Sequence, residues 1–159
     1  AGVSPQTSIA ALEKFQGVKR RMEIKGVVNG ITIYDDFAHH PTAIATTIAG
    51  LRHRVGNARI LAVLEPRSNT MKQGVWKDDL AASLRDAEAV FCYTANLGWD
   101  AAGALRSLGD KVKTSDDIDA LIKMIKQAVK TGDQVLIMSN GGFAGIHGKL
   151  LAKLKTTTS

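Results

Sequence analysis

Three apolar runs separated by helical patterns are the feature that most constrains how this chain folds. The runs cover residues 59–64, 89–93 and 134–138. Apart from a polar first residue in two of them, each is continuous rather than alternating, which is typical of strands covered on both faces. The chain is therefore predicted to form an α/β fold, with helices on both faces of a mostly parallel sheet.

Apolar spacing and capping residues place the helices. The clearest helix is predicted over residues 115–130, with Thr114 or Ser115 as its N-terminal cap. A second helix is expected to begin at Pro41, because proline favours the first helical position. Further helices are expected over residues 75–85, 101–108 and 144–154.

A β-hairpin is predicted before the first helix. Residues 22–28 and 31–34 flank Asn29-Gly30, a dipeptide that suits a two-residue turn because both of its positions require positive φ. The hairpin contributes one antiparallel strand near the start of the sheet. The whole pattern predicts a Rossmann-like, three-layer domain with about six strands.

The chain length fits one domain. A chain of 159 residues buries enough surface to fold without disulfides or metals, and residues 17–155 are assigned to this domain. Residues 1–16 have a short amphipathic pattern and are interpreted as a linker helix from a preceding central domain. A processed terminus or a removed tag would explain the missing initiator methionine equally well. Residues 156–159 are expected to form a disordered tail.

Composition and charge exclude several classes of protein. Apolar residues make up 45% of the chain and charged residues 23%, which excludes wholesale disorder. No apolar run approaches the roughly 18 residues that cross a bilayer, so no membrane partner is expected. The net charge is +6, but the basic residues are scattered along the sequence rather than clustered. A small anionic partner is therefore favoured over nucleic acid. A single cysteine, Cys92, excludes an internal disulfide and indicates a cytoplasmic protein.

Polar or glycine-rich segments follow four of the predicted strands. They are residues 35–41, 65–72, 94–100 and 139–142. In an open parallel sheet, ligands bind beyond the carboxyl ends of the strands. We therefore expect these four segments to gather along one rim and to form the binding site.

The first of these segments combines acidic and histidine residues. Asp36 ends a strand and is placed to accept hydrogen bonds from ribose hydroxyls, while His40 precedes a proline and is therefore held extended. This leaves the free amides of the first helical turn to face a ligand. Alternatively, Asp36 or His40 only caps the helix. Two adjacent histidines without a third ligand do not indicate a metal site, and none is predicted.

The second and fourth segments offer cations and accessible backbone. Arg67 and Lys72, with polar residues between them, suit a carboxylate or a phosphate, although a solvated loop would look the same. The turn Asn140-Gly141-Gly142 lets backbone approach a ligand closely or merely permits tight packing. Neither a Walker phosphate loop nor a Gly-x-Gly-x-x-Gly fingerprint is present.

Two strings in the chain resemble the opening of the C-terminal domain of the Mur ligases, the ATP-dependent amide ligases of peptidoglycan assembly. Residues 17–23 read Gly-Val-Lys-Arg-Arg-Met-Glu, and residues 34–42 read Tyr-Asp-Asp-Phe-Ala-His-His-Pro-Thr. The resemblance extends over residues 17 to 154. It is closest to the branch of the family that acts on UDP-N-acetylmuramate itself.

Within that branch, two further sequence strings distinguish ligases that use different acceptor substrates. A ligase for L-alanine would carry Pro-His-Arg after the third strand and Gly-Ala-Gly after the last, where this chain has Glu-Pro-Arg-Ser-Asn-Thr-Met-Lys at residues 65–72 and Ser-Asn-Gly-Gly-Phe at residues 139–143. The resemblance therefore implies a ligase that joins UDP-N-acetylmuramate to the tripeptide L-alanyl-γ-D-glutamyl-meso-diaminopimelate in peptidoglycan recycling. An L-alanine ligase domain and a stand-alone nucleotide- or anion-binding module are the alternatives.

The resemblance also implies roles for individual residues. Arg21 and Asp36 match catalytic positions at the ATP. The residues expected at ATP are Arg21, Asp36, Phe37, His39 and His40. The residues expected at the peptide substrate are Arg67, Ser68, Asn69, Lys72, Asn96, Asn140, Gly141 and Gly142. Phe37 stands where the family more commonly has tyrosine, so no role that needs a hydroxyl group is expected there.

The implied chemistry needs more than these residues. ATP and Mg²⁺ are the expected cofactors, and ATP activates the muramate carboxylate as an acyl phosphate that the peptide amine attacks. The Walker loop, the magnesium ligands and the UDP-sugar site are expected in the N-terminal and central domains of the same protein. This domain alone is therefore expected to be inactive and to serve in substrate binding and closure.

Overall fold

The computed structural model describes residues 20–67, 69, 73–74 and 76–156. Six strands form one sheet in the order β1-β2-β6-β3-β4-β5. The β1–β2 pair is antiparallel, and the other four pairs are parallel. This confirms the predicted α/β class and the early antiparallel strand. The expectations for residues 1–16 and 157–159 lie outside the described residues.

The bounds of the elements agree with most of the predicted segments. The strands are β1 (Glu23–Val28), β2 (Ile31–Asp36), β3 (Ile60–Leu64), β4 (Ala89–Tyr93), β5 (Val112–Ser115) and β6 (Gln134–Met138). The α-helices are α2 (Pro41–Val55), α4 (Lys77–Ser83), α5 (Ala101–Ala104), α6 (Ile118–Ala128) and α7 (Ile146–Lys155). Two 3₁₀ segments are η1 (Arg106–Lys111) and η2 (Phe143–Gly145). No described helix has the length and apolarity that a bilayer span requires.

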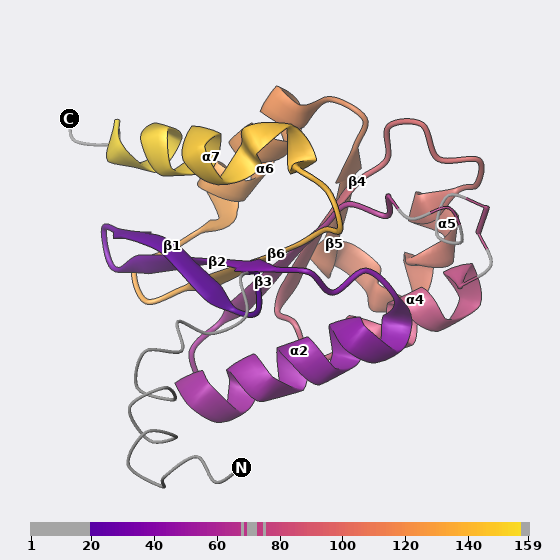
Figure 1. Ribbon diagram of the computed structural model, residues 1–159, viewed down its shortest axis with the longest axis horizontal. Coiled ribbons are helices and arrows are strands. Elements are labelled where there is room, and N and C mark those ends of the chain that lie inside the picture. Colours follow the sequence, from indigo (N-terminus) through magenta and orange to yellow (C-terminus); the bar gives the residue numbers. More distant parts are fainter. Residues whose placement is uncertain (1–19, 68, 70–72, 75, 157–159) are drawn as a thin grey trace, which may run out of the picture.

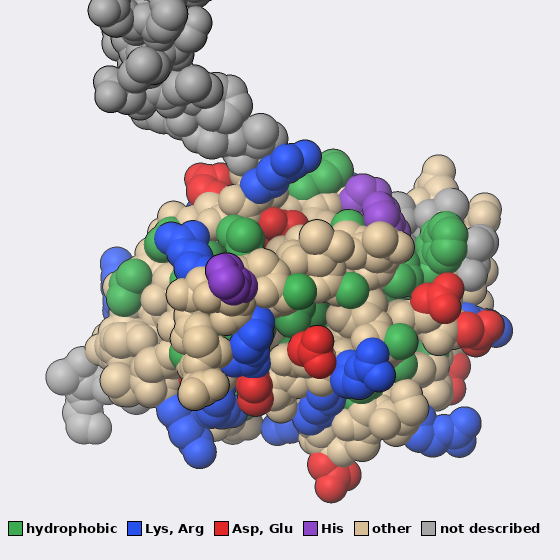
Figure 2. Space-filling view, turned by 90° about the horizontal axis from the view of Figure 1, so that it is seen from below, with side chains coloured by type: hydrophobic (Ala, Val, Ile, Leu, Met, Phe, Trp, Pro, Cys, Tyr) green, Lys and Arg blue, Asp and Glu red, His purple; other side chains and the backbone are tan. Residues whose placement is uncertain are grey.

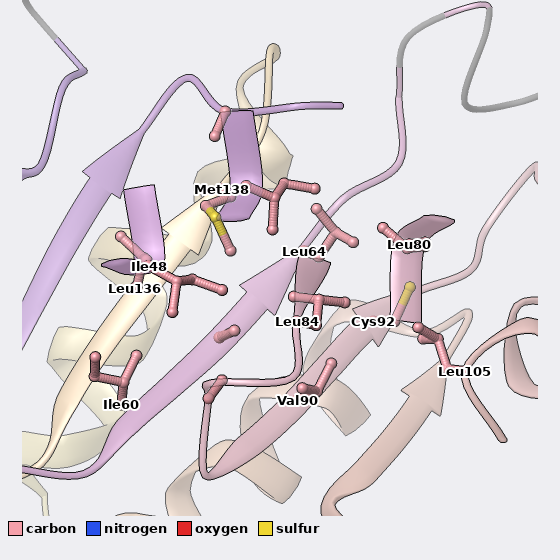
Figure 3. Packing of buried hydrophobic residues seen from close by; sticks show 14 of the residues in the cluster. Ile48, Ile60, Leu64, Leu80, Leu84, Val90, Cys92, Leu105, Leu136 and Met138 are labelled. Atoms are coloured by element: carbon pink, nitrogen blue, oxygen red, sulfur yellow. The ribbon is translucent and has the colours of Figure 1, made fainter. Parts of the chain in front are cut away.

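Helices cover the sheet on both faces, as Figure 1 shows: α6 and α7 lie above it, and α2 and α4 lie below it. Each layer buries its own apolar cluster against the sheet. Figure 3 shows part of the cluster on the α2 and α4 side, where Ile48, Leu64 and Leu80 pack with residues of β4 and β6. Burial of one such side chain contributes about 1.5–3 kcal/mol, so these two layers hold the strand ends in fixed positions.

Local chemistry explains the hairpin and α2. Asn29 and Gly30 have φ of 53° and 75°, so the predicted two-residue turn is confirmed. Pro41 is the first residue of α2, and the helix buries Ile44 among other apolar residues on the predicted face. His40 caps the helix, because its Nδ1 accepts a hydrogen bond from the N–H of Ala43 at 3.4 Å.

The segment before α6 differs from its prediction. The predicted start of the helix at residue 115 is wrong, because Val112–Ser115 forms β5 at the edge of the sheet. The predicted cap is wrong too: Asp117 is the cap, and its Oδ1 accepts a hydrogen bond from the N–H of Ala120 at 2.6 Å. The strand prediction for residues 31–34 also stopped early, because Asp35 and Asp36 continue β2.

Replacing Asp117 with alanine is expected to lower the free energy of unfolding by about 1 kcal/mol, because the first turn of α6 loses its capping acceptor. Urea unfolding followed by circular dichroism measures the change. Asp116→Ala is the matched control, since Asp116 is an exposed neighbour that precedes the cap. Equal losses in the two variants would show that charge at this end of the helix, rather than the cap, is responsible.

Candidate functional site

The carboxyl ends of β2, β6 and β3, three neighbouring strands, lie side by side at one end of the sheet. Ser139 follows β6 and donates its N–H to the carbonyl of Asp36 at the end of β2, at 3.1 Å. Glu65 follows β3 and donates its N–H to the carbonyl of Met138 at the end of β6, also at 3.1 Å. The loops that leave these strands therefore form one rim, on the right of Figure 1, where α2 begins. This confirms the predicted gathering for the segments that follow β2, β3 and β6, as far as their residues are described.

A pocket of about 410 Å³ opens on the rim. Two of the residues predicted to bind the peptide line it, Arg67 and Asn96. Gly141 borders Arg67 closely, because a Cβ atom at Gly141 would lie 2.5 Å from Arg67 Cδ. Asn69 is exposed, and Ser68 and Lys72 lie outside the described residues. The described residues that line it are Glu65, Pro66, Arg67, Tyr93, Ala95, Asn96 and Ala144.

The turn after β6 is fixed by side-chain hydrogen bonds. Ser139 Oγ donates to Glu65 Oε2 at 2.5 Å and accepts the N–H of Gly141 at 2.9 Å. Asn140 lies between these two anchored residues. Its Oδ1 is shielded from solvent and has no hydrogen-bond partner among the described residues. The turn therefore presents a fixed backbone next to the pocket.

The aromatic residues predicted to face the nucleotide form a cluster of rings beside this turn. The ring centroids of Phe37 and His39 are 5.2 Å apart, those of His39 and His40 are 5.4 Å apart, and both pairs meet edge to face. Phe37 is 46% exposed although it is a large apolar side chain. Arg21 is exposed as well. The structure thus brings these residues to the same rim as the pocket.

Asp36, which directly precedes this cluster in the chain, is buried, and its carboxylate accepts hydrogen bonds from three residues of the same chain. Oδ2 accepts the N–H of Met22 at 2.8 Å, and Oδ1 accepts the N–H of Ala38 at 2.8 Å and the hydroxyl of Thr47 at 3.3 Å. These contacts organise the turn from β2 into α2. The contact of Asp36 with a ribose stays a prediction, while His40 does cap α2, as the alternative interpretation held.

Arg20 is a residue of the rim that the sequence analysis did not select. Its Nε lies 3.2 Å from Asp35 Oδ2, and its Nη2 donates to the carbonyls of Ser139 at 2.6 Å and Gly141 at 2.9 Å. Its carbonyl accepts the N–H of Phe37. The partners lie up to 121 positions away along the chain, so no local pattern could have identified this role.

His147 completes the buried group around Asp35. Its Nε2 lies 3.1 Å from Asp35 Oδ1, on the side of the carboxylate opposite Arg20 and Lys25. Burial lowers the pKa of His147 below its ordinary value, and the charges of Lys25 and Arg20 lower it further, whereas Asp35 opposes the change. This shift favours the neutral form of His147.

This pKa shift predicts a pH dependence of stability. Since the pKa of His147 is lower in the folded state, the unfolded state binds more protons as the pH falls, and folding is weakened. The free energy of unfolding should fall more steeply between about pH 7 and about pH 5 in the wild type than in His147→Gln. Urea unfolding at both pH values measures this. Replacement of His53, an exposed histidine at the other end of the fold, is the control, and parallel losses in wild type and His147→Gln would contradict the prediction.

Unusual backbone conformations also gather at the rim. Six described residues other than glycine have positive φ, and one of them is Asn29 in the hairpin. Residues held in such conformations are concentrated at binding and catalytic sites, because the surrounding structure must stabilise them. The other five lie before β1 or after β4 and β6, and they are Arg20, Met22, Asn96, Phe143 and Ala144.

Other surfaces offer less to a specific ligand. A pocket of about 680 Å³ lies between α6 and α7 and is lined by exposed lysines, Lys123 and Lys153 among them, but it shares no lining residue with the rim pocket. Figure 2 shows positive and negative side chains interspersed over the face that carries α2 and α4. Within the described part of the chain, no group of three or more histidine, cysteine, aspartate or glutamate side chains is arranged to hold a metal ion.

Comparison with known proteins places this rim in a family. Residues 20–141 match the model described as "Mur ligase, glutamate ligase domain". The chain is 51% identical over 152 residues to the UDP-N-acetylmuramate–L-alanyl-γ-D-glutamyl-meso-2,6-diaminoheptandioate ligase of Escherichia coli, covering 94% of this chain and 33% of the relative. It is 30% identical to a UDP-N-acetylmuramate–L-alanine ligase of Mycobacterium, covering 97% of this chain and 34% of the relative.

A solved structure agrees with these relatives. The crystal structure of a murein peptide ligase from Psychrobacter arcticus superimposes with a TM-score of 0.80 at 44% identity, covering 99% of this chain and 34% of that one. The chain spans about a third of the length of the curated relatives that it matches. The matched family model covers the strand ends and the rim residues described above. The chain therefore belongs to the Mur ligase family, of which it carries the glutamate ligase domain.

Proposed function

We propose that the protein containing this chain joins UDP-N-acetylmuramate to L-alanyl-γ-D-glutamyl-meso-diaminopimelate with the use of ATP, in the recycling of peptidoglycan. The observation that carries the proposal is the rim pocket, in which Arg67 and Glu65 follow β3 and border the 139–141 turn. The name of the relative that is 51% identical supports the same acceptor.

The pocket supplies the recognition of the acceptor peptide. Arg67 has no ion-pair partner among the described residues and can match a carboxylate with two parallel hydrogen bonds. Asn96 adds an exposed polar side chain after β4, and the turn at Asn140, Gly141 and Gly142 forms the neighbouring wall. We propose that these groups hold the peptide so that its amine is directed at the activated muramate.

The aromatic cluster supplies a surface for the nucleotide. ATP, when bound, provides the phosphoryl group that activates the carboxylate. Phe37, His39 and His40 offer ring faces and edges, and the exposed Arg21 offers a cation for phosphates. We assign Mg²⁺ to ligands in the rest of the protein, because the described residues include no cluster of metal-binding side chains.

The remaining parts of the proposal concern the whole protein. We propose that N-terminal and central domains of the same chain carry the Walker loop and the UDP-sugar site, and that this domain closes over them. By itself, the domain would then bind substrates without ligating them. A cytoplasmic location is part of the same proposal, because the nucleotide-linked substrates are made there.

The test is an acceptor comparison with the full-length protein. UDP-N-acetylmuramate, ATP and Mg²⁺ are supplied with either the tripeptide or L-alanine, and phosphate release and product mass are recorded. We expect ligation of the tripeptide and little ligation of L-alanine. Preference for L-alanine would select the alternative ligase, and nucleotide binding without ligation of either acceptor would select a stand-alone binding module.

A further inference from the structure

Arg20 is the residue through which the aromatic cluster and the peptide pocket are connected. On the aromatic side, its carbonyl accepts the N–H of Phe37 at 2.8 Å, and its guanidinium carbon lies 5.4 Å from the centroid of the Phe37 ring. Both contacts tie Arg20 to Phe37, an exposed member of the aromatic cluster. A movement of Phe37 would therefore displace both the backbone and the guanidinium of Arg20.

On the pocket side, Arg20 fixes the turn after β6. Its Nη2 donates to the carbonyl of Ser139 at 2.6 Å and to that of Gly141 at 2.9 Å, so one nitrogen holds the backbone on both sides of Asn140. Hydrogen bonds from a charged donor are shorter and stronger than neutral ones. The conformation of the turn consequently depends on where the guanidinium lies.

The 139–141 turn also positions the charged residues of the pocket, Glu65 and Arg67. Ser139 Oγ donates to Glu65, and the side chain of Arg67 lies directly against Gly141. Any movement of the turn therefore displaces the two charged side chains that line the pocket. A misplacement of about 1 Å is enough to cost about 10²-fold in rate when reacting groups must be aligned.

The buried carboxylate of Asp35 sets the orientation of the guanidinium. Asp35 is 3% exposed and accepts from Arg20 Nε at 3.2 Å. Arginine suits this place because its planar fork directs Nε and Nη2 to different acceptors at once, which a lysine ammonium cannot reproduce. Lys25 Nζ also faces Asp35 Oδ2, at 3.8 Å. Lys25 shares the carboxylate, but its ammonium contacts Glu23 and Asp35 rather than the carbonyls of the turn.

We propose that Arg20 is a positioning residue that couples nucleotide binding at the aromatic cluster to peptide binding in the rim pocket. The inference rests on the proposed function, since it takes the aromatic cluster as the nucleotide side and the pocket as the peptide side. Coupling between two sites is reciprocal, so it can be measured as the factor by which one ligand changes the affinity for the other.

The experiment measures tripeptide affinity in the full-length protein by isothermal titration calorimetry, with and without a non-hydrolysable ATP analogue. We expect the analogue to tighten tripeptide binding by a factor of about 5–150 in the wild type. In Arg20→Lys, which keeps the positive charge, this factor should fall to about 2 or less, because the fork that spans the turn is lost. A retained factor in Arg20→Lys would overturn the proposal.

Two further variants test the clamp, by which we mean the pair of hydrogen bonds from Arg20 Nη2 to the carbonyls of Ser139 and Gly141. They distinguish its effect from that of a positive charge near Asp35 and from that of backbone strain. Lys25→Ala removes the other cation from Asp35 and should keep the wild-type factor; an equal loss there would overturn the proposal in favour of a general charge effect. Arg20→Gly removes the side chain while favouring the positive φ of 63° at this position, so the backbone is not strained by the change. Added guanidinium should partly restore the coupling in Arg20→Gly, and no restoration would count against the clamp.

Hydrogen exchange distinguishes failure of the inference from failure of the proposed function. In the ligand-free full-length protein, the amides of residues 139–141 should exchange faster in Arg20→Lys than in the wild type, because the turn loses its clamp. If the wild type binds neither tripeptide nor nucleotide, the proposed function fails. In that case unchanged exchange in Arg20→Lys would refute the clamp as well.

Discussion

Arg67→Ala in the full-length ligase is expected to lower kcat/KM for the tripeptide about 10- to 150-fold, with KM for ATP unchanged. The reason is the loss of charge-assisted hydrogen bonds to a substrate carboxylate, which contribute about 1.5–3 kcal/mol. Arg67 lines the rim pocket next to Gly141, where its guanidinium is available to a ligand. Steady-state kinetics at saturating ATP measure the effect.

Two variants control this prediction. Arg67→Lys keeps the charge but loses the planar fork, so it should restore only part of the activity toward the tripeptide. Arg54→Ala removes an exposed arginine from the far end of α2, where it lies over the Tyr34 ring, and should leave kcat/KM unchanged. Wild-type kinetics for the tripeptide in Arg67→Ala would remove Arg67 from the substrate pocket.

Asp36→Ala is expected to lower the free energy of unfolding by about 3 kcal/mol, because it removes the acceptor from one buried N–H group, one partly buried N–H group and one hydroxyl. The partly buried N–H belongs to Met22 and the buried one to Ala38, and neither has another acceptor within the described part of the chain. Urea unfolding monitored by circular dichroism measures the loss. A change below about 1 kcal/mol would show that these hydrogen bonds contribute little net stability.

The nucleotide role of Asp36 needs a separate readout. Asp36→Asn keeps the shape and one acceptor, so its stability should fall less than that of Asp36→Ala. If Asp36 also contacts the ribose, Asp36→Asn should raise KM for ATP, whereas Thr47→Ala, which removes only the hydroxyl donor, should not. Equal KM values for ATP in all three proteins would leave Asp36 with a structural role alone.

Much of the fold could be predicted because its signals are local. The strands at residues 60–64, 89–93 and 134–138 are buried on both faces, so their sequences are continuous apolar runs. Asn29-Gly30 predicted its turn from backbone preference alone. The edge strand β5 was missed because it is four residues long, with one apolar residue in Val-Lys-Thr-Ser, and resembles a loop.

The site was predictable only in part. The carboxyl ends of neighbouring parallel strands lie at the same end of a sheet. The proximity of Asp36, Arg67 and Asn140 therefore followed from the topology. The contacts of Arg20 did not, because they join residues 119 and 121 positions apart. Asp36 was predictable only as the end of a strand. Its three hydrogen-bond donors could not be predicted, because they depend on how the segment before β1 and helix α2 pack against the end of β2.

The most direct test of the rim as the acceptor site is a crystal structure of the full-length protein with ADP and the tripeptide product of ligation. The predicted result places a carboxylate of the peptide within hydrogen-bond distance of Arg67, with the peptide against the 139–141 turn. A peptide bound elsewhere, such as between α6 and α7 beside Lys123, would contradict the account.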